Sequence, residues 1–321
     1  MQVFVESMWK KQKYRELIQI MNFRFMDNEI VVENDLFYYG CMLTEIGELK
    51  GAINCFEAIG AIENYSCNMD FQYVCLAYFM TGKEEKADKY FRLWKKSNLD
   101  KKEHIDSWFT LLDIDNAMVV VESEKLKFHF EQCITNIERK NFIEKNRKAY
   151  QYIISIFKCI LPKKIDIFVF KTEIDYLGNR LSYANPALCT IHTKLEHTYG
   201  HEIVHVVTHY MYPHMCKTPF IDEGTAVYFD IPGKYFTKNR IKSKKISYIN
   251  IKDLWNNFRN YDPYISYEIA GEFVGFLIEK YSLDKFLLFI QEQTISHAQK
   301  TLGEDFEDSL KEFEIIINSN T

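Results

Sequence analysis

Residues 201–230 read HEIVHVVTHYMYPHMCKTPFIDEGTAVYFD, and this stretch predicts two helices built around a metal site. On the first helix His201 and His205 are one turn apart, so their imidazoles project from one face about 6 Å apart. Two ring nitrogens at that spacing can reach one zinc ion at about 2.0–2.1 Å each. Glu202 follows the first histidine, and its carboxylate can reach a water on the metal without binding the metal itself.

The second half of the stretch supplies a third ligand. Glu223 lies on the second predicted helix and is followed by Gly224 and Ala226. These small residues predict that the second helix crosses closely over the first. A carboxylate arriving from it completes a set of two histidines and one glutamate and leaves the fourth position to water. An H-E-x-x-H match alone also arises by chance in buried helices, and the downstream segment is what favours the metal site.

These two motifs, His201-Glu202-x-x-His205 and Glu223-Gly224-x-Ala226, resemble the gluzincin metallopeptidases, the class that includes thermolysin and the large zinc aminopeptidases. The resemblance covers roughly residues 117–321. Residues 267–281 are similar to the helix that follows the active site in that class, and residues 302–307 to its closing helical hairpin. The resemblance implies that His201, His205 and Glu223 bind Zn²⁺ and that Glu202 is the general base of peptide-bond hydrolysis.

Hydrolysis also needs a donor for the developing oxyanion besides the metal. In gluzincins a tyrosine or histidine from a later segment supplies it. The resemblance implies Tyr267, which opens the matching helix, with Tyr264 as the alternative three residues earlier.

The sequence departs from the family in two places. The Gly-x-Met-x-Asn segment of zinc aminopeptidases is absent, since residues 178–187 read GNRLSYANPA, so an endopeptidase is favoured over an aminopeptidase. Thermolysin-like enzymes place an aspartate four residues after the ligand glutamate to orient a histidine, and Val227 stands there. Asp222 or Asp230 is left to orient the histidine.

The other residues near the motif are expected to lie outside the metal site. The metzincin pattern requires glycine at 208 and histidine at 211, and Thr208 and Met211 exclude it. A straight helix carries His209 a further turn from the metal, so a core position is expected. His192 and His197 precede the helix and are expected to be structural rather than to face the cleft. The lysine-rich segment 234–245 is interpreted as a solvated loop, with an acidic substrate or partner as the alternative.

The first hundred residues repeat with a period of 35. Turn-like, small and bulky residues recur in phase at Gln12, Gly47 and Gly82, at Leu17, Ala52 and Ala87, and at Met21, Phe56 and Phe91. First helices are predicted at 36–46 and 71–81, and second helices at 48–59 and 83–95. The pattern resembles the tetratricopeptide repeat, whose helix pairs stack to bury their apolar faces. The alternative is an ordinary helical bundle with accidental periodicity.

The pattern of the sequence changes after residue 116. Residues 101–116 predict one more helix, and 136–161 a long amphipathic helix. Strands are predicted at 117–122, 125–131, 164–170 and 188–192, and helices predominate from 201 onward. We therefore predict a helix-rich α+β fold, with a tetratricopeptide-like repeat domain at 1–116 and a gluzincin-like domain with a small sheet at 117–321.

Composition limits the class of protein. The 321 residues are 47% hydrophobic, enough for a substantial core. A formal net charge of −5 argues against nucleic acid as a partner, which requires a basic excess. No stretch approaches the 18 consecutive apolar residues of a membrane-spanning helix. The first 13 residues lack the apolar run of a signal peptide. No two of the eight cysteines have the C-x-x-C spacing of a structural zinc site or redox motif. We expect a cytoplasmic protein without a membrane span.

These observations predict a zinc-dependent peptidase whose helical repeats present a peptide or protein substrate. One alternative is a protein-interaction scaffold with an inactive or structural metal site, but an intact Glu202 argues against it. The other is a metal-dependent peptide-modifying oxygenase, because two histidines and one carboxylate also suit iron(II).

Overall fold

The computed structural model describes residues 19–21, 33–45, 47–65, 72–97, 118–171, 182–186, 189–197, 199–212, 217–230 and 248–319. The chain divides into two compact units. The first comprises Met1–Gln132, Pro162–Lys164 and Tyr176–Gly178, and the second Cys133–Leu161, Ile165–Asp175 and Asn179–Thr321. The predicted boundary between residues 116 and 117 and the predicted helix at 101–116 lie outside the described residues.

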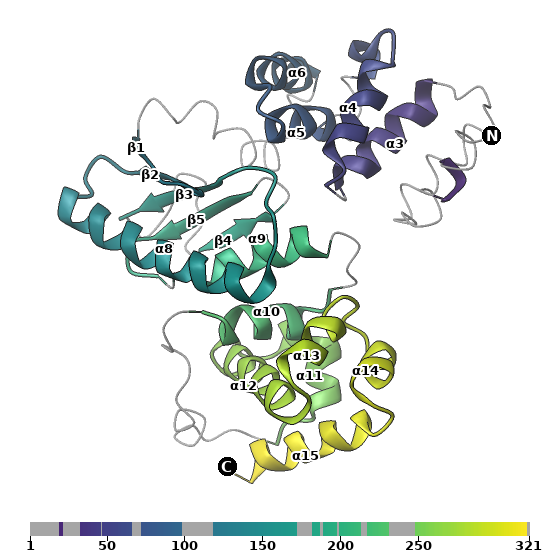
Figure 1. The fold of residues 1–321 in the computed structure, drawn as a ribbon, viewed down its shortest axis with the longest axis vertical. Helices are drawn as coiled ribbons and strands as arrows, with labels where there is room; N and C mark the ends of the chain where they lie inside the picture. Colours follow the sequence, from purple (N-terminus) through teal and green to yellow (C-terminus); the bar gives the residue numbers. More distant parts are fainter. Residues whose placement is uncertain are drawn as a thin grey trace. The chain divides into compact units, whose positions relative to one another are not determined.

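The first unit contains two helix–turn–helix segments (Figure 1). Its helices are α3 (Glu33–Glu45), α4 (Leu49–Glu57), α5 (Gln72–Met80) and α6 (Glu84–Ser97), with the short 3-10 helix η1 (Ile62–Tyr65) between the pairs. The turns contain Gly47 and Gly82, whose φ angles of 82° and 73° lie in the region that glycine adopts at little cost. The four helices agree with the predicted ones, whereas the first copy of the repeat lies almost wholly outside the described residues.

Packing inside this unit explains the in-phase small and aromatic residues. Ala52 and Ala87 are fully buried, and Phe56 and Phe91 lie beside them in the same apolar core. The ring of Phe56 rests on Gly40 of α3, where a Cβ atom would lie 2.5 Å from the ring. A larger residue at position 40 would therefore push α3 away from α4.

The sheet has five strands in the order β1-β2-β3-β5-β4. They are β1 (Val119–Glu122), β2 (Leu126–Phe130), β3 (Ile165–Phe170), β4 (Tyr183–Asn185) and β5 (Thr190–Lys194). β1 and β2 are antiparallel, β3 and β5 parallel, and β4 and β5 antiparallel, so the sheet is mixed. β3 is buried along its whole length, Asp166 included, because it pairs inside the sheet between β2 and β5. Together with the helices, the sheet confirms a helix-rich α+β fold.

Two helices of the second unit connect the sheet to the site. α8 (Asn136–Phe157) begins with a capping box, in which Thr135 and Glu138 each bind the other's backbone N–H. It packs against α9 (His201–Met211), and α9 also contacts β4 and β5.

The strand β4 was not predicted, and the other four strands lie within two residues of their predicted positions.

The rest of the second unit is helical (Figure 1). It comprises α10 (Pro219–Tyr228), α11 (Ile251–Asn257), the 3-10 helix η6 (Phe258–Asn260), α12 (Pro263–Tyr281), α13 (Leu283–Phe289), α14 (Ile295–Leu302) and α15 (Phe306–Asn318). An aromatic core holds these helices together: Trp255 of α11 contacts Phe220, Phe273, Phe289 and Phe306. Among the described helices, none combines the length and apolarity needed to cross a bilayer.

The close crossing predicted for Gly224 involves a different helix from the one expected. A Cβ atom at Gly224 would lie 2.5 Å from the backbone oxygen of Ala270, which belongs to α12. The small residue after Glu223 therefore lets α10 approach α12, and the prediction that it serves the crossing over α9 was wrong. The packing reason is that α10 packs more extensively against α12 than against α9.

Candidate metal centre

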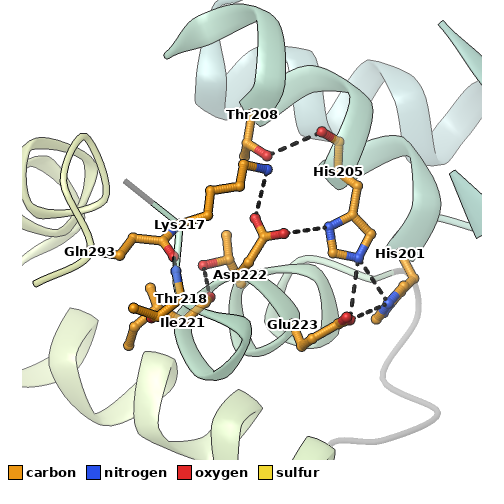
Figure 2. Close-up of polar contacts among 10 residues, drawn as sticks. His201, His205, Thr208, Lys217, Thr218, Ile221, Asp222, Glu223 and Gln293 are labelled. Carbon is orange, nitrogen blue, oxygen red and sulfur yellow. Dashed lines mark hydrogen bonds and ion pairs between the residues drawn. The ribbon is translucent and has the colours of Figure 1, made fainter. Parts of the chain in front are cut away.

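α9 has an apolar face and a polar face that follow from its sequence. Ile203, Val204, Val206 and Val207 are buried, which fixes the rotation of the helix about its axis. That rotation turns His201 and His205, one turn apart, toward α10 (Figure 2). Both imidazoles are partly shielded, with exposed fractions of 14% and 12% for their side chains.

Glu223 of α10 meets these two histidines (Figure 2). Its Oε2 lies 3.2 Å from Nε2 of His201 and 3.3 Å from Nε2 of His205. The two Nε2 atoms are 3.3 Å apart, so the three atoms form a nearly equilateral triangle. Each imidazole carries at most one hydrogen on its Nε2 atom. If both rings do, both N–H groups can donate to Glu223, but the two Nε2 atoms then face each other as two donors with no acceptor between them.

The dimensions of the triangle fit a tetrahedral ion. Donor atoms about 2.0–2.1 Å from a tetrahedrally coordinated zinc ion lie about 3.3 Å from one another. Among the described residues, His201, His205 and Glu223 form the cluster of histidine, cysteine and carboxylate side chains whose ligand atoms lie within 4.8 Å of one another. The structure thus brings together the three residues that were predicted as metal ligands.

Asp222 orients one of the two histidines. Its Oδ2 accepts a hydrogen bond from Nδ1 of His205 at 3.2 Å, which leaves Nε2 of the same ring turned toward Glu223. A carboxylate on the far nitrogen of a ligand histidine fixes its tautomer and its ring orientation. Of the two aspartates left open by the sequence, Asp222 therefore holds the imidazole.

Asp230 binds the backbone at the start of α9. Its Oδ1 accepts the backbone N–H groups of Gly200 at 2.8 Å and of His201 at 3.3 Å. Because these groups have no partner inside the helix, the carboxylate caps α9 at the residue where the site begins.

The charges around the site are dominated by carboxylates. Burial raises the pKa values of Asp222 and Glu223, but hydrogen bonds from the histidines outweigh burial and lower the pKa of Asp222 to about 2 and that of Glu223 below its usual range. Burial by itself lowers the pKa of His205, and hydrogen bonds to Asp222 and Glu223 reverse the effect and raise it to about 10. The two adjacent carboxylates are thus stabilised by positive charge on His205, and a divalent cation held by the same atoms would stabilise them in the same way.

Glu202 lies next to this cluster. Burial raises the pKa of Glu202; the charges of His201 and His205 oppose that shift, and the carboxylates of Glu223 and Asp230 add to it. A carboxylate with a raised pKa beside a metal site is suited to accept a proton.

Tyr267 reaches the site and Tyr264 faces solvent. The ring of Tyr267 stacks on that of His201, with 6.3 Å between the ring centroids, and the ring of Phe258 packs against Tyr267 with 5.3 Å between the centroids. Burial and the adjacent Glu223 carboxylate, to which the phenol is hydrogen-bonded, raise the pKa of Tyr267. The hydroxyl is therefore protonated at neutral pH and available as a donor. Tyr264, by contrast, is 80% exposed.

The remaining candidate histidines lie outside the triangle. His192 is buried on β5 and stacks between Phe168 and Tyr183, with centroid distances of 5.0 Å and 4.6 Å. His209 is half-buried, and burial lowers its pKa to about 4. His197 lies in the turn between β5 and α9. The lysine-rich segment 234–245 and half of segment 178–187 lie outside the described residues.

Two residues that approach the site were not predicted. Lys217 donates to Oδ1 of Asp222 at 2.8 Å, and Gln293 accepts the backbone N–H of Thr218 at 2.8 Å (Figure 2). In the sequence, Lys217 was indicated only by its position five residues before Asp222. No sequence pattern indicated Gln293, which is distant along the chain.

Comparison of the chain with known protein families gives no match, and comparison with curated proteins gives none either.

Proposed function

We propose that the protein is a zinc-dependent peptidase that hydrolyses peptide bonds at the site formed by α9 and α10. The observation that carries the proposal is the triangle of Nε2, Nε2 and Oε2 atoms with edges of 3.2–3.3 Å, contributed by His201, His205 and Glu223. Its edges equal the donor separation around a tetrahedral zinc ion, about 3.3 Å. Three protein ligands also leave a position for water, as catalytic zinc sites do.

Glu202 and Tyr267 give this site the groups that hydrolysis needs. A bound zinc ion supplies Lewis acidity, which lowers the pKa of a water molecule and polarises the scissile carbonyl. Glu202 accepts the proton of the attacking water and passes it to the leaving amine. Tyr267 donates its hydroxyl hydrogen to the oxygen on which negative charge develops. Its raised pKa keeps that hydrogen in place at neutral pH.

We further propose that helices α3 to α6 of the first unit present the substrate. Their two helix–turn–helix segments follow the 35-residue period of the sequence and pack Ala52, Phe56, Ala87 and Phe91 into one core. Helical repeats of this kind offer extended surfaces for a peptide or protein partner.

The experiment combines metal analysis with cleavage of a diverse peptide library, on the full-length chain. The wild type should bind one zinc ion, and His201→Ala and Glu223→Ala should each lose it. Glu202→Gln should keep the metal and lose hydrolysis, because it removes only the base. His297→Ala, which removes a histidine from α14, controls for the loss of an imidazole elsewhere.

Two outcomes would contradict the proposal. Full zinc occupancy in both His201→Ala and Glu223→Ala would place the metal elsewhere. Iron in place of zinc, with oxygen-dependent modification of peptides and no cleavage, would identify the oxygenase alternative.

A further inference from the structure

Lys217 contacts the carboxylate that orients a ligand. Its Nζ donates to Oδ1 of Asp222 at 2.8 Å, while Oδ2 of the same carboxylate accepts from Nδ1 of His205 at 3.2 Å. Both oxygens of Asp222 are thus engaged at once, one by each partner (Figure 2). The carboxylate cannot rotate about its side chain without losing one of the two contacts.

The Lys217–Asp222 pair is less exposed to solvent than an ordinary surface ion pair. The side chains of Lys217 and Asp222 are 27% and 20% exposed, in contrast to 69% and 61% for the Lys148–Glu144 pair on α8. Exposed pairs contribute little because water and salt screen them, whereas shielded pairs retain more of their attraction. Removal of Lys217 would also leave a shielded carboxylate with one partner fewer.

The segment that carries Lys217 is itself anchored. The backbone N–H of the next residue, Thr218, donates to Oε1 of Gln293 at 2.8 Å. Gln293 lies between α13 and α14 and is only 1% exposed, so its amide is held by the surrounding core. A continuous series of contacts therefore runs from Gln293 through Thr218, Lys217 and Asp222 to His205.

We infer that Lys217 is a positioning residue for the metal centre, which fixes Asp222 so that His205 presents Nε2 to the ion. The inference rests on the proposed function, since it assigns Lys217 to the construction of the same site. Residues that orient metal ligands affect metal affinity about 10–100-fold when they are removed. Lys217 acts through one further carboxylate, so the lower end of that range, about tenfold, is expected.

The test measures the dissociation constant of Zn²⁺ for the full-length chain, by competition with a chromophoric chelator. Lys217→Met should weaken binding about tenfold, and Lys217→Arg, which retains a cationic donor, should recover most of the affinity. Lys148→Met is the matched control, because it breaks an ion pair of the same 2.8 Å length with a glutamate that touches no ligand. It should bind zinc as the wild type does.

A second measurement separates positioning from a general loss of structure. The visible absorption of the Co²⁺-loaded protein should shift in Lys217→Met, since the geometry of His205 changes, and should not shift in Lys148→Met. If Lys217→Met does not fold, Gln293→Leu replaces it, with a smaller shift in the same direction expected.

The outcomes distinguish this inference from the proposed function. Equal zinc affinity and equal Co²⁺ spectra in the wild type and Lys217→Met would overturn the role of Lys217 and leave the metal centre intact. A wild type that binds no zinc, or that keeps it in His201→Ala and Glu223→Ala, would overturn both.

Discussion

Asp230, two residues beyond the end of α10, caps the helix that begins at His201. Its Oδ1 lies 2.8 Å from the N atom of Gly200 and 3.3 Å from that of His201, so the segment that follows α10 fixes the N-terminal end of α9. The distance between His201 and Glu223 therefore depends on a contact at the end of each helix as well as on packing between them.

Replacement of Asp230 should affect stability and metal binding together. Loss of a helix cap costs about 1 kcal/mol, so Asp230→Ala should lower the free energy of unfolding by that amount and weaken zinc binding. Urea denaturation of the metal-free protein and a zinc titration measure the two effects. Thr135→Ala removes the cap of α8 and should lower stability without changing zinc affinity. Equal zinc affinity in both variants would show that Asp230 serves stability alone.

A methyl group at Gly224 should separate α10 from α12. In Gly224→Ala the new Cβ atom would lie 2.5 Å from the backbone oxygen of Ala270, which cannot move without its helix. Overpacking of this kind costs about 1–3 kcal/mol, and the shift of α10 should also displace Glu223 and weaken zinc binding. Denaturation and zinc titration measure both effects.

Gly51→Ala is the control for this substitution. Its Cβ atom would meet only a terminal carbon of Leu43 at 3.2 Å, and alanine is the better helix former by about 1 kcal/mol. The control should therefore be as stable as the wild type or slightly more stable. Similar losses in both variants would mean that Gly224 has no special packing role.

Tyr267→Phe should reduce turnover with zinc content and substrate affinity nearly unchanged. The phenol stacks beside His201, and in the proposed reaction it would contact the oxyanion only in the transition state, so the loss is expected in kcat. Removal of one such donor costs about 10²–10³-fold. Steady-state kinetics on a cleaved peptide measure the effect, and Tyr264→Phe should be mild because Tyr264 faces solvent. The reverse pattern would transfer the role to Tyr264.

The N-terminus of α8 should lose stability in acid. The hydrogen bond from Lys171, followed by those within the capping box, lowers the pKa of Glu138 from 4.5 to about 2. A carboxyl whose pKa is lower in the folded state stabilises the fold above its unfolded pKa, and this contribution is lost as the pH falls through the folded value. The contribution of Glu138 should therefore be complete above about pH 4.5 and disappear toward pH 2.

Glu138→Gln tests this pH dependence, because glutamine preserves the capping box and removes only the charge. Urea midpoints of the two proteins should differ at pH 7 and converge as the pH falls below 4. A gap that stays constant from pH 7 to pH 3 would contradict the role of the charge.

Local sequence patterns were sufficient for most of the fold. The β-branched and aromatic residues of 164–170 and the alternation at 125–131 predicted β3 and β2, and the 35-residue period predicted α3 to α6. The strand β4 escaped prediction because it has only three residues and intermediate burial throughout. It exists by pairing with β5, and such pairing depends on a neighbour rather than on a local pattern.

For the candidate site, the sequence by itself determined what the geometry of one helix dictates. A spacing of four residues places His201 and His205 on one face, and Glu202 lies beside them. The sequence could not decide between Asp222 and Asp230 as the partner of a histidine, because both lie close to Glu223 along the chain. Tertiary structure placed Asp222 against the ring of His205 and Asp230 against the backbone of His201.

Tertiary structure alone also decided which distant segments support the site. Ala270 receives Gly224, and Gln293 anchors Thr218 beside Lys217. Neither pairing follows a local period, since each joins residues that are far apart along the chain. Packing of the aromatic core around Trp255 sets the positions of α10, α12 and α13, and the contacts of Gly224 and Gln293 depend on that packing. Spacing along a helix encodes the pair of histidines, whereas the packing of helices from separate parts of the chain encodes the contacts that hold them in place.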